Sequence, residues 1–150
     1  MPITPLHFGP AFLMKGAIGA RFSLLAFALS QVLLDIEPGL KLFGLIPENG
    51  GLHTGHTWPM GAGVAVLSVG GSLLWARCVW RLQRCRLWAE ASGATFGVVS
   101  HLLLDALYHA DVASSVFLPE LNAVVSRDTI DYTLATATFA GLVLLYKKPV

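Results

Sequence analysis

The stretch TWPMGAGVAVLSVGGSLLWA, residues 57–76, decides the fold class, because it contains no charged residue over 20 positions. A transmembrane helix needs about 20 predominantly apolar residues to cross the hydrocarbon layer of a bilayer. This stretch alone is therefore long enough to predict a helix that spans a membrane. Three shorter apolar stretches accompany it: residues 22–34, 91–104 and 132–146.

The shorter stretches reach spanning length only if polar residues at their ends face the interior of a helix bundle. Asp35, His101 and Asp105 occupy such positions. Glycines scattered through residues 61–97 would let helices approach closely within a membrane. A transmembrane β-barrel is disfavoured, because its strands alternate apolar and polar residues and these stretches do not.

The composition agrees with a membrane environment. Apolar residues make up 55% of the 150-residue chain and charged residues only 13%, whereas soluble domains carry roughly 25% charged residues. The mean hydropathy is +0.65. We therefore predict a single all-α domain over residues 1–150, an integral membrane bundle of about four helices. Because three stretches are short, a soluble hydrophobic helical domain remains the alternative.

The distribution of charge predicts an orientation. If the spans alternate, most basic residues fall on one side, and Lys41 and Arg127 fall on the other. The positive-inside rule makes the basic side cytoplasmic, in a multi-pass protein of a bacterial-type inner membrane. The basic residues on this side are Lys15, Arg21, Arg77, Arg81, Arg84, Arg86, Lys147 and Lys148. A net charge of +1 without a basic stripe excludes nucleic acid as the expected partner.

The strongest local signal is SHLLLDALYH, residues 100–109, in which His101, Asp105 and His109 follow one another at a spacing of four. In a helix these side chains lie on one face. The two histidines are too far apart along the axis to share one ion, at roughly 12 Å. Asp105 stands between them, so it could bridge two metal ions.

Two further polar clusters fall on the same, outer side of the predicted bundle. Asp35 and Glu37 follow the first apolar stretch, and His53 and His56 precede the second. Imidazole and carboxylate groups together suit zinc or another first-row divalent ion such as manganese. His7 can join them only if residues 10–20 form a short re-entrant helix that enters from the outer side and turns back.

These residues resemble those of the membrane-bound metal-dependent hydrolase family, the YdjM-like inner-membrane proteins, which are distantly similar to zinc-dependent phospholipase C. The resemblance runs from His7 to His109 and is most specific over residues 100–105. Two positions differ from the family pattern. The family usually shows Pro-Asp-x-Asp where this chain has Leu34-Asp35-Ile36-Glu37. Thr54 stands where an Arg is common in the family.

The resemblance implies that one or two ions, zinc or manganese, are bound by a set of His and Asp residues. It further implies hydrolysis of a phosphoester or lipid by metal-activated water, with Glu37 as general base and His109 as a second catalytic or ligating group. The residues themselves establish only a polar cluster suited to metal. The implied ligands are His7, Asp35, His53, His56, His101 and Asp105.

Two other functions fit the same residues. In a non-catalytic membrane subunit or scaffold, they would form a structural metal site or hydrogen-bond network, and the protein partner would be unknown. In an ion or proton transporter, polar groups should extend through both halves of the bundle. The predicted inner half of the bundle contains almost no polar groups, so a transporter is the least favoured of these functions.

Overall fold

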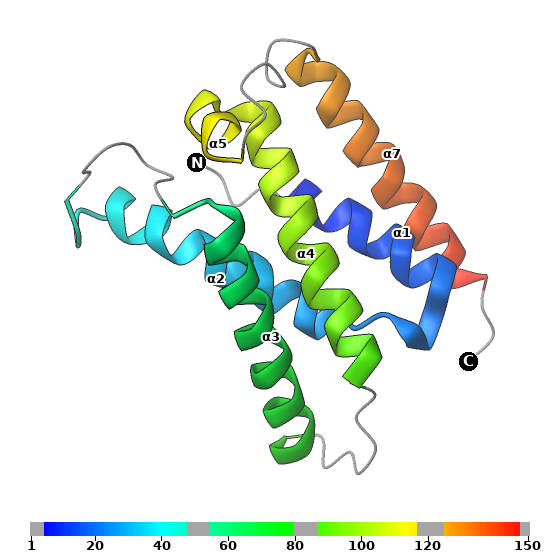
Figure 1. Ribbon diagram of the computed structural model, residues 1–150. Coiled ribbons are helices and arrows are strands. Elements are labelled where there is room, and N and C mark those ends of the chain that lie inside the picture. Colours follow the sequence, from blue (N-terminus) through cyan, green and yellow to red (C-terminus); the bar gives the residue numbers. More distant parts are fainter. Residues whose placement is uncertain (1–4, 48–54, 80–86, 117–124, 148–150) are drawn as a thin grey trace.

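The computed structural model describes residues 5–47, 55–79, 87–116 and 125–147, and in these ranges it contains helices and no strand (Figure 1). The all-α prediction is confirmed. Two 3-10 turns, η1 and η2, lie beside the first helix. The elements in chain order are η1 (Pro5–Phe8), α1 (Gly9–Ile18), η2 (Gly19–Arg21), α2 (Leu24–Leu42), α3 (Trp58–Cys78), α4 (Leu87–Tyr108), α5 (Ala110–Ser115) and α7 (Arg127–Tyr146).

Side-chain caps fix where three of the long helices begin. Ser23 accepts a hydrogen bond from the Ala26 N–H at the start of α2, and Thr57 caps α3 in the same way. Ser126 caps α7 by accepting from the Thr129 N–H. A hydroxyl cap satisfies a backbone donor that has no partner within the helix and stabilises it by about 1 kcal/mol. In these three helices the sequence places Ser or Thr directly before the first helical residue.

The first long helix extends beyond its predicted end. Its apolar stretch stops at residue 34, but α2 continues to Leu42 and includes Pro38. Glu37 and Lys41 form an i,i+4 ion pair at 2.6 Å in this extension, a pairing that supports helix. Asp35 therefore lies inside a helix and does not end one.

Helices α2, α3 and α4 form the core that holds the functional residues. α2 and α4 run in the same direction, since Ser23 lies beside Gly93 and Phe27 beside Gly97. α3 runs opposite to α4, because Gly61, near its start, packs against Leu102. The buried apolar residues between these helices and α5 are Leu34, Val64, Val98, Leu102, Ala106, Val112, Ala113 and Val116.

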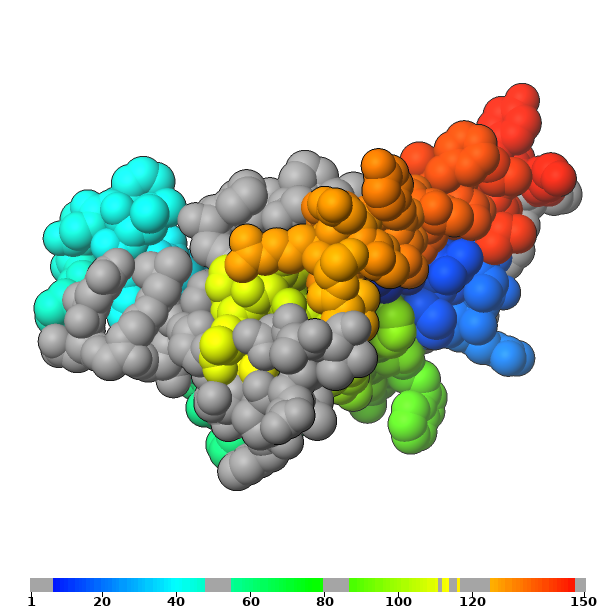
Figure 2. All heavy atoms as spheres, turned by 90° about the horizontal axis from the view of Figure 1, so that it is seen from above, coloured from blue at the N-terminus to red at the C-terminus, as the bar shows by residue number. Residues whose placement is uncertain are grey.

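The N-terminal helix α1 packs along α7 and runs parallel to it. Gly9 contacts Thr138, and Gly16 contacts Leu144. Gly19 has a φ of 60°, a left-handed conformation that glycine adopts readily, and there the chain turns back toward α2. A short helix is therefore present in the region of residues 10–20, as the approach of His7 to the other polar clusters required. The view in Figure 2 shows α7 and α1 on one side of the molecule and the end of α2 on the opposite side.

Two of the described helices, α3 and α7, are long and apolar enough to cross a membrane. In the most apolar 18-residue window of each helix, only 28% and 17% of the residues are buried inside the molecule. Residue ranges 22–34 and 91–104, also predicted as spans, lie in α2 and α4, which carry the buried polar residues. Length and composition thus support two spans.

We expect Gly93→Ala to destabilise the fold, because a Cβ at Gly93 would lie only 2.2 Å from the Ser23 carbonyl oxygen. The backbones of α2 and α4 would have to separate, at a cost of about 1–3 kcal/mol. Gly63→Ala is the matched control, since a Cβ there meets nothing within 4 Å, and in a helix alanine is favoured by up to about 1 kcal/mol. Thermal unfolding in detergent measures both; equal melting temperatures would contradict the close packing.

Candidate metal centre

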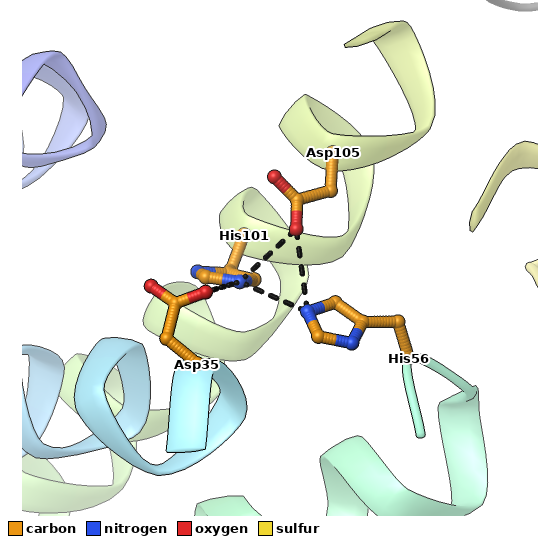
Figure 3. Close-up of side chains that lie close together, drawn as sticks. All are labelled: Asp35, His56, His101 and Asp105. Carbon is orange, nitrogen blue, oxygen red and sulfur yellow. Dashed lines mark hydrogen bonds and ion pairs between the residues drawn. The ribbon is translucent and has the colours of Figure 1, made fainter. Parts of the chain in front are cut away.

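Four side chains from three parts of the chain meet inside the core (Figure 3). Each of them offers one ligand atom, and these four atoms lie within 4.8 Å of one another. His56 and His101 are 1% and 0% exposed, so the imidazoles are fully enclosed. The group consists of Asp35 from α2, His56 from the segment before α3, and His101 and Asp105 from α4.

Four of the separations between these side chains are close to those around a tetrahedral metal ion. His101 Nε2 lies 3.3 Å from His56 Nε2, 3.3 Å from Asp105 Oδ2 and 3.5 Å from Asp35 Oδ1. His56 Nε2 is 3.3 Å from Asp105 Oδ2. Bonds of about 2.0–2.1 Å to a tetrahedral zinc ion set the ligand atoms about 3.3 Å apart. The residues therefore fit a divalent ion in both chemistry and spacing.

Local structure explains this convergence. The i,i+4 spacing in α4 places His101 and Asp105 on one helical face. The antiparallel course of α3 brings His56, just before its cap Thr57, to the same level. The parallel course of α2 brings Asp35 to His101. The predicted meeting of the three polar clusters is confirmed for these four residues.

His7 lies at the edge of this group. Its Nε2 is 4.0 Å from Asp105 Oδ1, the carboxylate oxygen that does not face His56. The His7 and His101 rings also meet edge to face, with centroids 5.5 Å apart. Burial lowers the pKa of His7 below its ordinary value, against the opposing attraction of Asp105. A lowered pKa favours the neutral imidazole, which is the form that binds metal. Asp105 stands between His7 on one side and His56 and His101 on the other.

Glu37 lies outside the four-residue group. Its Oε1 accepts a hydrogen bond from Lys41 Nζ at 2.6 Å. Its Oε2 lies against Gly55, where an added Cβ would be only 2.0 Å away. The Glu37 carboxylate therefore lies beside Gly55, the residue that precedes His56, and also forms an ion pair with the buried Lys41.

The two remaining predicted residues differ in what the structure shows. His53 lies outside the described residues. α4 ends at Tyr108, so His109 follows the helix and does not continue it, although its N–H still donates to the Asp105 carbonyl at 2.7 Å. His109 does not belong to the four-residue group among the described side chains.

Sequence reasoning missed two polar residues near the centre. Gln31 is 3% exposed and contacts His101, and Lys41 is 7% exposed and pairs with Glu37. Gln31 interrupts the apolar stretch of residues 22–34, and that interruption was the signal available. The sequence pattern places Lys41 only among the outer charges and gives no sign that it is buried.

No family model matches the chain, and no curated protein or solved structure is significantly similar to it.

We expect detergent-purified protein to contain at least about one equivalent of zinc or manganese. His101→Ala and Asp105→Asn should lose it, because each removes one of the four donors. Asp128→Asn is the control, an exposed carboxylate in the first turn of α7. Elemental analysis of the folded proteins gives the content. Wild-type protein that stays free of metal after incubation with divalent ions would rule the centre out.

Proposed function

We propose that the protein is a multi-pass protein of a bacterial-type inner membrane that hydrolyses a phosphoester or a lipid with one or two divalent metal ions. The observation that carries this proposal is the buried group of two imidazoles and two carboxylates, with ligand atoms within 4.8 Å of one another. Zinc suits this donor set best, and manganese is the second choice. The resemblance to the YdjM-like hydrolases supplies the reaction class.

Apolar side chains exposed on the outside of the molecule support the proposal that it is inserted in a bilayer. Leu67 in α3 is 65% exposed and Phe139 in α7 is 71% exposed, although both helices belong to one packed molecule. α2 and α4 have 19 and 22 residues, which at about 1.5 Å per residue is close to the ~30 Å thickness of the hydrocarbon layer. These two helices keep their ionisable residues toward the core, as membrane helices do.

The helix directions support the proposed orientation. Ser92 Oγ, near the start of α4, donates to the Arg21 carbonyl at 2.6 Å, so the turn after α1 lies at that end of the bundle. α3 runs opposite to α4, and so Arg77 near the end of α3 lies there too. This is the end we assign to the cytoplasm. The metal centre lies toward the other end, near the periplasmic face.

Asp35, His56, His101 and Asp105 would hold the ion. When bound, such an ion supplies a water activated near neutral pH and polarises a phosphoryl oxygen. Asp35 has a side chain that is 20% exposed, whereas those of His56, His101 and Asp105 are 0–4% exposed. We therefore propose that substrate approaches the ion from the Asp35 side.

A second ion would use Asp105 Oδ1 together with His7, and His109 would complete that site. Glu37 is proposed as general base, as its place beside the segment before His56 allows. Its ion pair with Lys41 stabilises the carboxylate form, so accepting a proton requires that this pair loosen.

The second candidate function is a structural metal site in a non-catalytic membrane subunit. One observation favours it: the group offers four protein donors, which would fill a tetrahedral shell, whereas catalytic zinc sites keep one position for water. The partial exposure of Asp35 and the extra imidazole of His7 favour the hydrolase.

Membrane insertion has a direct test. We expect the protein to stay in the membrane pellet after washes with high salt and with alkaline carbonate, because its exposed helices face lipid. Detergent should release it. Release by alkali alone would support the soluble alternative.

For activity, we expect hydrolysis of a chromogenic phosphodiester or of phospholipid in mixed micelles, lost on chelation and restored by zinc or manganese. Asp35→Asn should lower turnover by about 100-fold or more, since a ligand contributes several kcal/mol through the metal. Glu37→Gln should keep its metal and still lose about 100-fold, if the carboxylate takes a proton. Asp128→Asn should match wild type. Full metal occupancy without turnover on these substrates would favour the structural metal site.

A further inference from the structure

Gln31 is a buried amide one helical turn before Asp35, on the same face of α2. Its side chain bridges α2 and α4 with two contacts. Nε2 donates to the Gly97 carbonyl at 2.8 Å, and Oε1 lies 2.8 Å from His101 Nδ1. Both contacts are buried.

The first contact determines the second. A backbone carbonyl can only accept a hydrogen bond, so the Gln31 amide nitrogen must face Gly97. The amide oxygen then faces His101, and it too can only accept. His101 Nδ1 must therefore carry a proton and donate it to Gln31.

The opposite nitrogen of the His101 ring faces the metal centre. Nε2 lies 3.5 Å from Asp35 Oδ1 and 3.3 Å from Asp105 Oδ2. A neutral imidazole has one proton, and a proton on Nδ1 leaves the lone pair on Nε2. Without Gln31, the two carboxylates would draw that proton to Nε2 and occupy the atom that must bind the ion.

We propose that Gln31 is a positioning residue that fixes the tautomer and ring orientation of His101 for metal binding, a role that rests on the proposed metal centre. Partners that hold the second nitrogen of a ligating histidine commonly contribute 10–100-fold to metal affinity. The backbones of α2 and α4 lie close together at this bridge, since a Cβ at Gly97 would lie 3.3 Å from the Phe27 carbonyl oxygen.

The test is the zinc dissociation constant, measured in detergent by competition with a chelator. Gln31→Met keeps the length of the side chain and removes the acceptor, so zinc should bind about 10–100-fold more weakly. Gln31→Glu keeps an oxygen toward Nδ1 and should bind zinc more tightly than Gln31→Met. Ser30→Ala is the matched control, because Ser30 is also buried in α2 but its Oγ donates to Phe27 O within its own helix.

A role in packing alone would alter thermal stability without moving the proton on His101. Nitrogen NMR of histidine-labelled protein therefore accompanies the titration, with the His101 ring assigned by its loss in His101→Ala. We expect His101 to carry its proton on Nδ1 in zinc-loaded wild type and to show a mixture in metal-free Gln31→Met at high pH.

The outcomes separate the two proposals. If wild type binds zinc and folded Gln31→Met binds it equally well, the role of Gln31 is wrong and the metal centre stands. If wild type binds neither zinc nor manganese, the metal centre is wrong and the role of Gln31 falls with it. If Gln31→Met does not fold, metal-free wild type at high pH decides between the two roles. A proton on Nε2 of His101 overturns the role of Gln31, and a proton on Nδ1 supports it.

Discussion

Two carboxylates and two imidazoles enclosed within a few ångströms are the constraint on which the rest of this structure depends. Asp35 and Asp105 both lie within 3.5 Å of His101 Nε2. Removing a charge from water costs several kcal/mol unless it is paired, and the bundle around these groups is apolar. A divalent cation among them would balance the two carboxylates and give each imidazole nitrogen an electron-pair acceptor.

The glycine contacts make that enclosure possible. Gly93 and Gly97 let α2 approach α4 until Ser23 and Ser30 touch its backbone. Gly61 lets α3 close on Leu102, one residue after His101. A ligand set must be held to within about 0.5 Å by rigid elements, and backbones at contact distance provide that rigidity. The glycines that suit helix packing in lipid therefore also hold the four candidate ligand residues in place.

The sequence predicted the helices and most of the centre because both depend on local spacing. Apolar runs set the helices, and the i,i+4 pair of His101 and Asp105 required only that its stretch be helical. The extension of α2 past Asp35 could not be predicted, since it depends on a tertiary environment that tolerates Pro38 and buries Lys41. The short helix α5 and the bridge from Gln31 are likewise set by packing between elements. For the same reason the end of α4 just before His109 escaped prediction.

The arrangement around Asp105 bears on the choice between a structural and a catalytic ion. A structural site needs four donors and nothing more, and here Asp105 Oδ2 already faces both His56 and His101. Its other oxygen faces His7, a partly buried imidazole that a closed four-ligand shell would leave without a function. An imidazole placed at the free oxygen of a shared carboxylate is what a two-ion site requires. Since paired ions of this kind act mainly on phosphate esters, the position of His7 links the geometry to the proposed hydrolysis.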